Sequence, residues 1–153
     1  DLHSFPTRRS SDLLRTSNKV VTTSNVGYSY RTNLSSLSTS YRPDRFDASL
    51  IFYDYALRLV ADSPSEAECA LRLKKTLFIN MKMCISQEVP RVSGKSRREA
   101  CRAIRNMAGD ERLLKVINDY PCERLGFKQK AFVQLLRHQA ANVLYMAAVK
   151  RVI

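Results

Sequence analysis

The sequence predicts a mainly α-helical protein in which a short strand pair precedes about five helices. From Pro43 onward, apolar residues recur at helical spacing. Before Pro43, two short segments have the β-branched or alternating composition of strands. The chain has 153 residues, 44% of them hydrophobic and 26% charged, so it can build a core and is not a disordered tail.

The first thirteen residues are excluded from the predicted fold. Residues 3 to 13 read HSFPTRRSSDL, which resembles the one-frame translation of a common short-read sequencing adapter. Residues 1 and 2 resemble the end of a preceding adapter copy. We therefore treat 1–13 as a non-native segment and expect Leu14 to be a truncation point. The segment holds two Arg and two Asp, so the net charge of +12 does not depend on it.

Residues 14–42 are expected to form a strand pair and a loop. Lys19 to Thr23 (KVVTT) is β-branched, and Val26 to Thr32 (VGYSYRT) alternates in polarity. The intervening Ser-Asn is a turn signal. Residues 33–41 are Ser-rich, which disfavours regular structure. Because two strands alone are marginally stable, we expect a missing N-terminal sheet for them to join.

Residues 43–153 are expected to form a helical tail. A first helix after Pro43 is indicated by an apolar stripe at Phe46, Leu50, Tyr53, Leu57 and Val60. Residues 63–66 (SPSE) match a capping box, which predicts a long helix from there to about Gln87.

Glycine and proline residues divide the rest of the tail. Residues 90–95 should break the long helix, and a third helix should cover Arg97 to Ala108 before Gly109. Residues 110–119 give a short helix before Pro121. The last helix is expected to run unbroken from Phe127 to Val152, roughly 39 Å at the helical rise per residue.

The net charge of +12 favours an anionic partner: nucleic acid, an acidic membrane surface or phosphorylated substrates. Arg98, Arg102 and Arg105 share a helix face by their spacing, and Lys128 and Lys130 begin the last helix. We expect these five side chains to contact anions or a membrane surface. The alternative is that they form only the solvated side of core-facing helices.

Several kinds of site lack support in the sequence. The four cysteines are far apart with no C-x-x-C pair, and His138 has no potential metal ligand beside it, so no metal site and no catalytic residue is assigned. No run approaches the roughly 18 apolar residues of a membrane span. Nucleic-acid binding has no zinc-finger, RNA-recognition or helix-turn-helix pattern behind it, and we consider it the weaker interpretation of the charge.

The most informative segment is Tyr28-Ser29-Tyr30-Arg31, followed by a second short motif at Ser36-Leu37. It resembles the C-terminal signature of bacterial family 2 glycosyltransferases, in which a Y-x-Y-R strand precedes an S-I or S-L pair and an amphipathic helix. The basic helical tail is also similar to that of capsule- and lipopolysaccharide-type members. The resemblance covers residues 18–150.

This resemblance implies a parent enzyme with an α/β nucleotide-sugar-binding sandwich, cytoplasmic or peripheral on the inner face of the bacterial membrane. It would transfer a sugar, with inversion, from a nucleotide-sugar to a surface-polysaccharide or lipid-linked acceptor, using Mg²⁺ or Mn²⁺ at a D-x-D motif. No D-x-D occurs after residue 13, so the fragment is expected to be catalytically incomplete and to hold no cofactor.

The resemblance also suggests roles for individual residues. Arg31 and Ser36 would bind the diphosphate, since a guanidinium offers a planar fork to phosphate oxygens. Tyr28 and Tyr30 would face the sugar or pack in the sheet.

The alternative function is a small basic helical module that binds nucleic acid or a protein partner.

Overall fold

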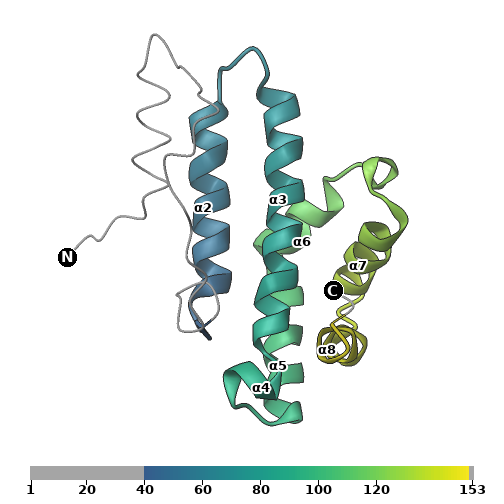
Figure 1. Cartoon of the computed structure of the whole chain (residues 1–153). Coiled ribbons are helices and arrows are strands. Elements are labelled where there is room, and N and C mark those ends of the chain that lie inside the picture. The colour runs from purple at the N-terminus through teal and green to yellow at the C-terminus, as the bar shows by residue number, and fades with distance from the viewer. Residues whose placement is uncertain (1–39, 152–153) are drawn as a thin grey trace, which may run out of the picture. The chain divides into compact units, whose positions relative to one another are not determined.

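Helices make up the regular structure of the computed structural model, which describes residues 40–151 (Figure 1). The described helices are α2 (Arg45–Val60), α3 (Glu66–Gln87), α4 (Pro90–Ser93), α5 (Arg97–Ala108), α6 (Glu111–Asn118), α7 (Phe127–Arg137) and α8 (Ala141–Val149), with a 3-10 turn at Cys122–Arg124. The expectation of a mainly helical protein is confirmed for these residues, which belong to one compact unit. The expected strand pair lies outside them.

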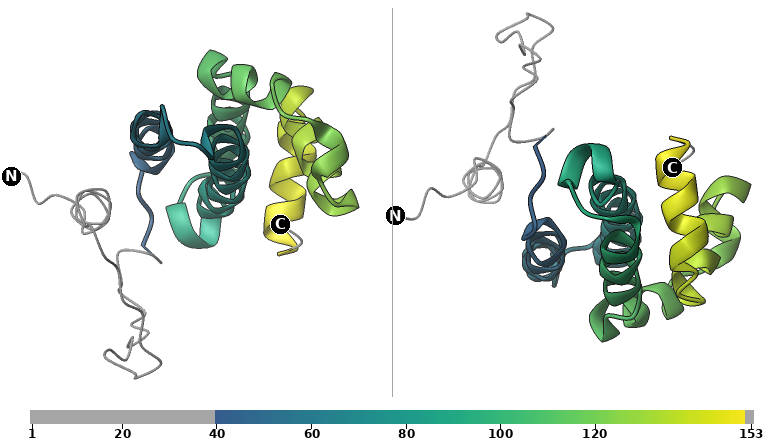
Figure 2. Two further views of the ribbon diagram at one scale, coloured as in Figure 1. Left: turned by 90° about the horizontal axis from the view of Figure 1, so that it is seen from above. Right: turned by 90° about the horizontal axis from the view of Figure 1, so that it is seen from below.

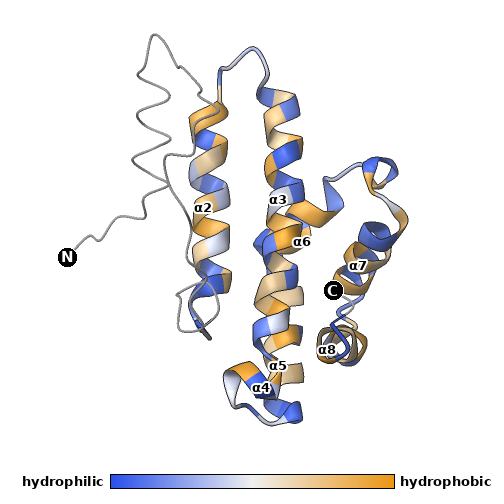
Figure 3. Ribbon diagram, viewed as in Figure 1, coloured by the Kyte–Doolittle hydropathy of each residue, from blue (hydrophilic) through white to orange (hydrophobic). Residues whose placement is uncertain are grey.

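The first two helices form an antiparallel hairpin (Figure 1). On α2 the predicted stripe faces the core: Leu50 and Tyr53 are buried, and Phe46 and Leu57 pack against the cluster. Figure 3 shows hydrophilic and hydrophobic residues interspersed along both helices. The amphipathic spacing therefore explains the hairpin, because each helix hides one side from water.

The core continues from α3 into the shorter helices. Ile104 of α5, Ile117 of α6 and Leu144 of α8 are fully buried. Each such side chain contributes about 2 kcal/mol by leaving water. Helix α8 packs against α3, α5 and α7, and the two views in Figure 2 show it beside the α3 and α5 layer. The core thus fixes the position of α8 relative to α5.

The predicted capping box at the start of α3 is wrong. Ser65, not Ser63, is the N-cap residue, and its side chain makes no capping hydrogen bond. Ser63 Oγ accepts a hydrogen bond from the Ser65 N–H at 3.2 Å, and the Glu66 carboxylate accepts one from the Asp62 N–H at 3.1 Å. These bonds belong to the turn before the helix, in which Asp62 has a φ of 64°.

The break expected over residues 90–95 contains a short helix. Helix α3 ends at Gln87 as expected, but Pro90 then occupies the first turn of α4, where its missing N–H is not needed. Gly94 ends α4 with a φ of 72°, a left-handed conformation that glycine adopts without strain. The chain therefore reverses into α5 through a structured corner.

The single helix expected over 127–152 is also wrong, because the chain turns between α7 and α8. Gln139 has a φ of 49°, its N–H donates to the Leu136 carbonyl, and the Ala140 N–H donates to the Leu135 carbonyl, each at 2.9 Å. This is a Schellman motif with a non-glycine residue in the left-handed position. The turn brings α8 back onto α5 instead of extending the rod.

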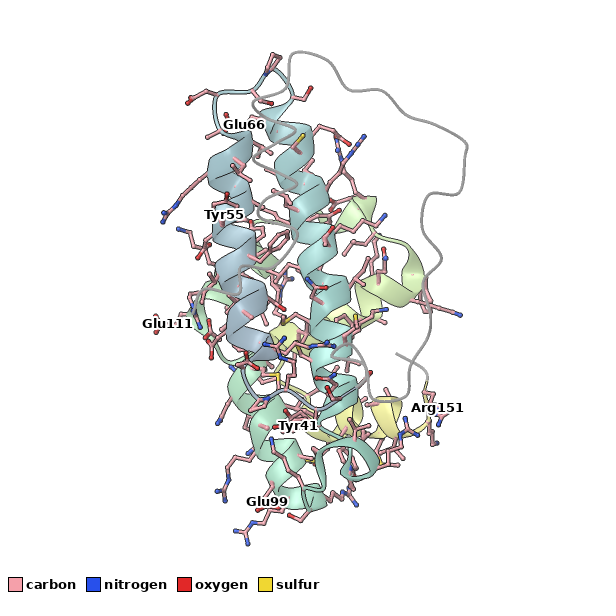
Figure 4. All side chains as sticks on the ribbon, turned by 60° about the vertical axis from the view of Figure 1, so that its left-hand side comes forward. Tyr41, Tyr55, Glu66, Glu99, Glu111 and Arg151 are labelled. Carbon is pink, nitrogen blue, oxygen red and sulfur yellow. The ribbon has the colours of Figure 1, made fainter. Side chains whose placement is uncertain are left out.

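A partly buried ion pair lies at the corner between α3 and α5. The Glu88 carboxylate, 6% exposed, is 2.5 Å from Lys95 Nζ and accepts a bond from the Tyr41 hydroxyl at 3.3 Å. Burial opposes the charge on Lys95, yet its contacts with Glu88 and Tyr41 outweigh that effect and raise its pKa. Figure 4 shows Tyr41 toward the same end of the helical domain as Glu99, opposite Glu66.

Candidate anion-binding surface

The first turn of α5 is capped by hydrogen bonds between Ser96 and Glu99. Ser96 Oγ accepts a hydrogen bond from the Glu99 N–H at 3.3 Å, and the Glu99 carboxylate accepts one from the Ser96 N–H at 2.8 Å. This capping box fixes the first turn, and the bonds from Ser96 lower the pKa of Glu99. The S-x-x-E pattern at residues 96–99 is the sequence signature of this helix start.

Helix α5 presents a row of arginines over an open depression of about 520 Å³. The residues that line it come from α5 and from the first turn of α8: Arg97, Arg98, Cys101, Arg102, Arg105 and Asn142. We call this the arginine depression. All four arginines are exposed, and Cys101 is buried, with 9% of its surface exposed.

The four guanidinium groups of the arginine depression have no carboxylate partner within residues 40–151. None of them forms a hydrogen bond or an ion pair there. Glu99, on the same helix, is already engaged by Ser96, and its influence on Arg102 is only electrostatic. By contrast, Arg112 on α6 bridges Asp110 and Asp47. The positive charge of α5 is therefore available to a ligand.

The helix dipole adds to this positive field. Arg97 and Arg98 occupy the first turn of α5, where unsatisfied N–H groups already place partial positive charge. Cations in that turn weaken a helix slightly, so the arrangement is unfavourable for folding and favourable for anion binding.

Helix α8 packs against α5 and contributes the remaining lining residue of the site. Asn142, at its start, lines the arginine depression with Cys101 and Arg105. Tyr145 follows Asn142 by about one turn on α8. The Arg97 guanidinium lies over the Tyr145 ring, 5.8 Å from the ring centroid. Tyr145 also lines a second depression, of about 230 Å³, with Val89, Pro90, Arg91 and Val149. The two depressions therefore adjoin at the Arg97–Tyr145 contact.

The structure brings together only some of the residues singled out in the sequence. Arg98, Arg102 and Arg105 line one depression, whereas Lys128 and Lys130 are on α7 and do not. Tyr28, Tyr30, Arg31 and Ser36 lie outside the described residues.

Three lining residues, Arg97, Cys101 and Asn142, were not among the residues predicted to contact anions. Arg97 could have been found from its spacing to Cys101 and Arg105, which follow it one and two turns later on the same helix. Asn142 could not, because an unbroken helix over 127–152 would carry it away from α5. Residues 138–140 contain neither glycine nor proline to signal the turn.

The other titratable groups of the described region do not form a second site. Cys84 is buried, and burial raises its pKa to about 11, so it is a poor nucleophile. All four cysteines are free thiols. Residues 40–151 contain no group of three or more potential metal ligands. The Mg²⁺ or Mn²⁺ expected for the parent enzyme concerns an upstream motif and stays a prediction.

None of the described helices combines the length and apolar character needed to cross a bilayer.

Comparison with known proteins gives no match: no protein-family model, curated protein or solved structure is detectably similar to this chain. The proposed function therefore rests on the geometry of the arginine depression and on the sequence.

Proposed function

We propose that the helical domain is an anion-binding module whose ligand groups are phosphates. One observation carries the proposal: four arginines converge on a depression with no carboxylate partner among the described residues. Guanidinium groups stay charged at any working pH and offer paired donors to phosphate oxygens. A cluster of like charges is repulsive unless an anion neutralises it.

The form of the site indicates what kind of anion it takes. The arginine depression is open, and four of its six lining residues are arginines, unlike the enclosed apolar pockets that hold small molecules. It suits phosphate groups displayed on a larger body, with several arginines bound to neighbouring phosphates. Asn142 adds an uncharged donor at the edge.

Inorganic pyrophosphate tests this proposal by NMR. We expect amide shifts concentrated at residues 97–105 and Asn142, and weaker as salt is raised. Equal shifts around Lys128 and Lys130 would indicate charge attraction without a site. No shift at α5 would refute the proposal.

We further propose that this module is the C-terminal part of a family 2 glycosyltransferase. The support is the sequence resemblance at Tyr28–Arg31 and Ser36. The parent would transfer a sugar from a nucleotide-sugar to a surface-polysaccharide or lipid-linked acceptor on the cytoplasmic side of a bacterial membrane. An anion-binding tail would hold such an enzyme near acceptors that carry phosphate.

The source DNA upstream of Leu14 tests the parentage. Continuation of the reading frame into a strand-helix domain with D-x-D would support a glycosyltransferase, and a start codon just before Leu14 would refute it. In the full-length enzyme, Arg31→Ala should weaken nucleoside-diphosphate binding in calorimetry while the fold is retained. Unchanged affinity for the nucleoside diphosphate would contradict only the role assigned to Arg31 and would leave the proposed parentage standing.

A further inference from the structure

Helix α8 exposes an apolar strip that its packing does not use. Leu144 and Ala148 point into the core, whereas Val143 is 52% exposed and Met146 and Val149 are each 40% exposed. For a nine-residue helix this is a large apolar area left in water. We call Val143, Met146 and Val149 the α8 strip.

The α8 strip runs beside the arginine depression. Asn142, Met146 and Val149 share one helix face by their spacing of four and three residues. Asn142 lines the arginine depression, and Val149 lines the adjoining second depression. Met146 lies between them on that face by spacing, which places the apolar strip next to the arginines of α5.

Cations also lie at the far end of the α8 strip. Lys150 and Arg151 are exposed immediately after α8, and Figure 4 shows Arg151 at its end. The exposed Arg91 donates to the Ala148 carbonyl at 3.5 Å, near the C-terminus of the helix. The apolar strip is thus bordered by positive charge along α5 and at its end.

We infer that this surface docks on an anionic lipid bilayer, with the α8 strip entering the headgroup region and the arginines of α5 binding lipid phosphates. The inference rests on the proposed anion-binding function and names its partner. An apolar strip edged by Arg and Lys is what the interface between headgroups and acyl chains accommodates. A nucleic-acid backbone would match the arginines but would leave Val143 and Met146 in water. Helix α8 is too short to span a bilayer, so it would lie in the plane of the membrane.

The absence of tryptophan from the sequence allows a clean test. Met146→Trp places a fluorophore on the α8 strip, and Ile51→Trp places one at an exposed apolar position of α2, 55% exposed. With vesicles containing anionic phospholipid, Met146→Trp fluorescence should shift to shorter wavelength and be quenched by brominated lipid. Ile51→Trp should show neither change, and vesicles of zwitterionic lipid alone should leave both reporters unchanged.

The outcomes separate this inference from the proposed function. Binding to anionic vesicles without a change at Met146→Trp would overturn the bilayer insertion and leave anion binding intact. A Met146→Trp change with RNA but not with vesicles would also overturn it. Loss of both vesicle binding and the pyrophosphate shifts would refute the proposed function itself. If Met146→Trp does not fold, as judged by circular dichroism, Val143→Trp on the same strip takes its place with the same expected results.

Discussion

The Arg97 guanidinium lies 5.8 Å above the ring of Tyr145 and joins two surfaces of different chemistry. On the α5 side it belongs to the arginine depression, and on the α8 side Tyr145 belongs to a largely apolar one. Stacking on an aromatic ring holds an arginine in place while leaving its N–H edges free to donate. The contact therefore holds Arg97 at the arginine depression with its N–H groups able to donate to an anion.

The partly buried pair Glu88–Lys95 should respond unequally to removal of its two members. Glu88 is 6% exposed and Lys95 30% exposed, so Lys95 can reach water and Glu88 cannot. Lys95→Met should lower the free energy of unfolding by about 3 kcal/mol, because it leaves a buried charge uncompensated. Glu88→Gln should lower it by about 1 kcal/mol.

Urea unfolding checks this order, and the double variant is the control. Lys95→Met combined with Glu88→Gln should be more stable than Lys95→Met alone, since the uncompensated charge is gone. Equal losses for the two single variants would show that burial of Glu88 does not determine the energetics of the pair.

Asp110 should make the stability of α6 depend on pH. Its carboxylate accepts bonds from the N–H groups of Arg112 at 2.9 Å and Leu113 at 3.4 Å, and it pairs with the Arg112 side chain. The bond from the Arg112 side chain is the main reason that its pKa lies below the ordinary 3.8. The stabilisation is therefore present above about pH 3.8 and is lost as the pH falls through the lower pKa of the folded state.

The variant Asp110→Ala isolates this contribution. It should lower the free energy of unfolding at pH 7 by about 1 kcal/mol, the usual value of an N-cap, and by less at pH 2. Asp54→Ala is the control, because Asp54 is exposed on α2 with no hydrogen bond or ion pair among the described residues. Urea unfolding at both pH values measures the difference. An equal loss of unfolding free energy at pH 7 and pH 2 would show that the charge of Asp110 does not contribute to the stability of α6.

The turn between α7 and α8 should become more stable when Gln139 is replaced by glycine. A left-handed φ costs a non-glycine residue about 1 kcal/mol, and Gln139 has a φ of 49°. Gln139→Gly should therefore raise the thermal midpoint, and Gln139→Val, with its branched side chain, should lower it. Calorimetry of the two variants checks the sign. A lower midpoint for Gln139→Gly would mean that its side chain, which lies near Gly109, contributes more than the strain costs.

Where the sequence predicted the helices well, it carried explicit boundary signals. Helix α5 has the expected bounds because Gly109 follows it, and α6 lies between Asp110 and Pro121. The α7–α8 turn had no such signal. Gln139 adopts a left-handed conformation that its residue type does not favour, and burial of Leu144 and Ala148 against the rest of the core compensates for the strain.

The sequence predicted most of the arginines that α5 contributes to the candidate site but not the residues that α8 contributes. Spacing placed Arg98, Arg102 and Arg105 on one face, since all three are on a single helix. The contribution of α8 depends on how two helices pack, which no local pattern encodes. The positions of Asn142 and Tyr145 beside α5 therefore depend on the turn at Gln139, which the sequence did not predict.

The decisive measurement for a binding surface at α5 is flotation with anionic vesicles at increasing salt. Arg98→Ala/Arg102→Ala removes two charges from the arginine depression, and Arg58→Ala/Lys75→Ala removes two exposed charges from α2 and α3. An arginine near an anionic bilayer contributes about 1 kcal/mol, so the first variant should bind about 30-fold more weakly than wild type and with a shallower salt dependence. The second should bind almost as wild type does. Equal weakening of both would show that net charge alone attracts the protein and would contradict a binding surface at α5.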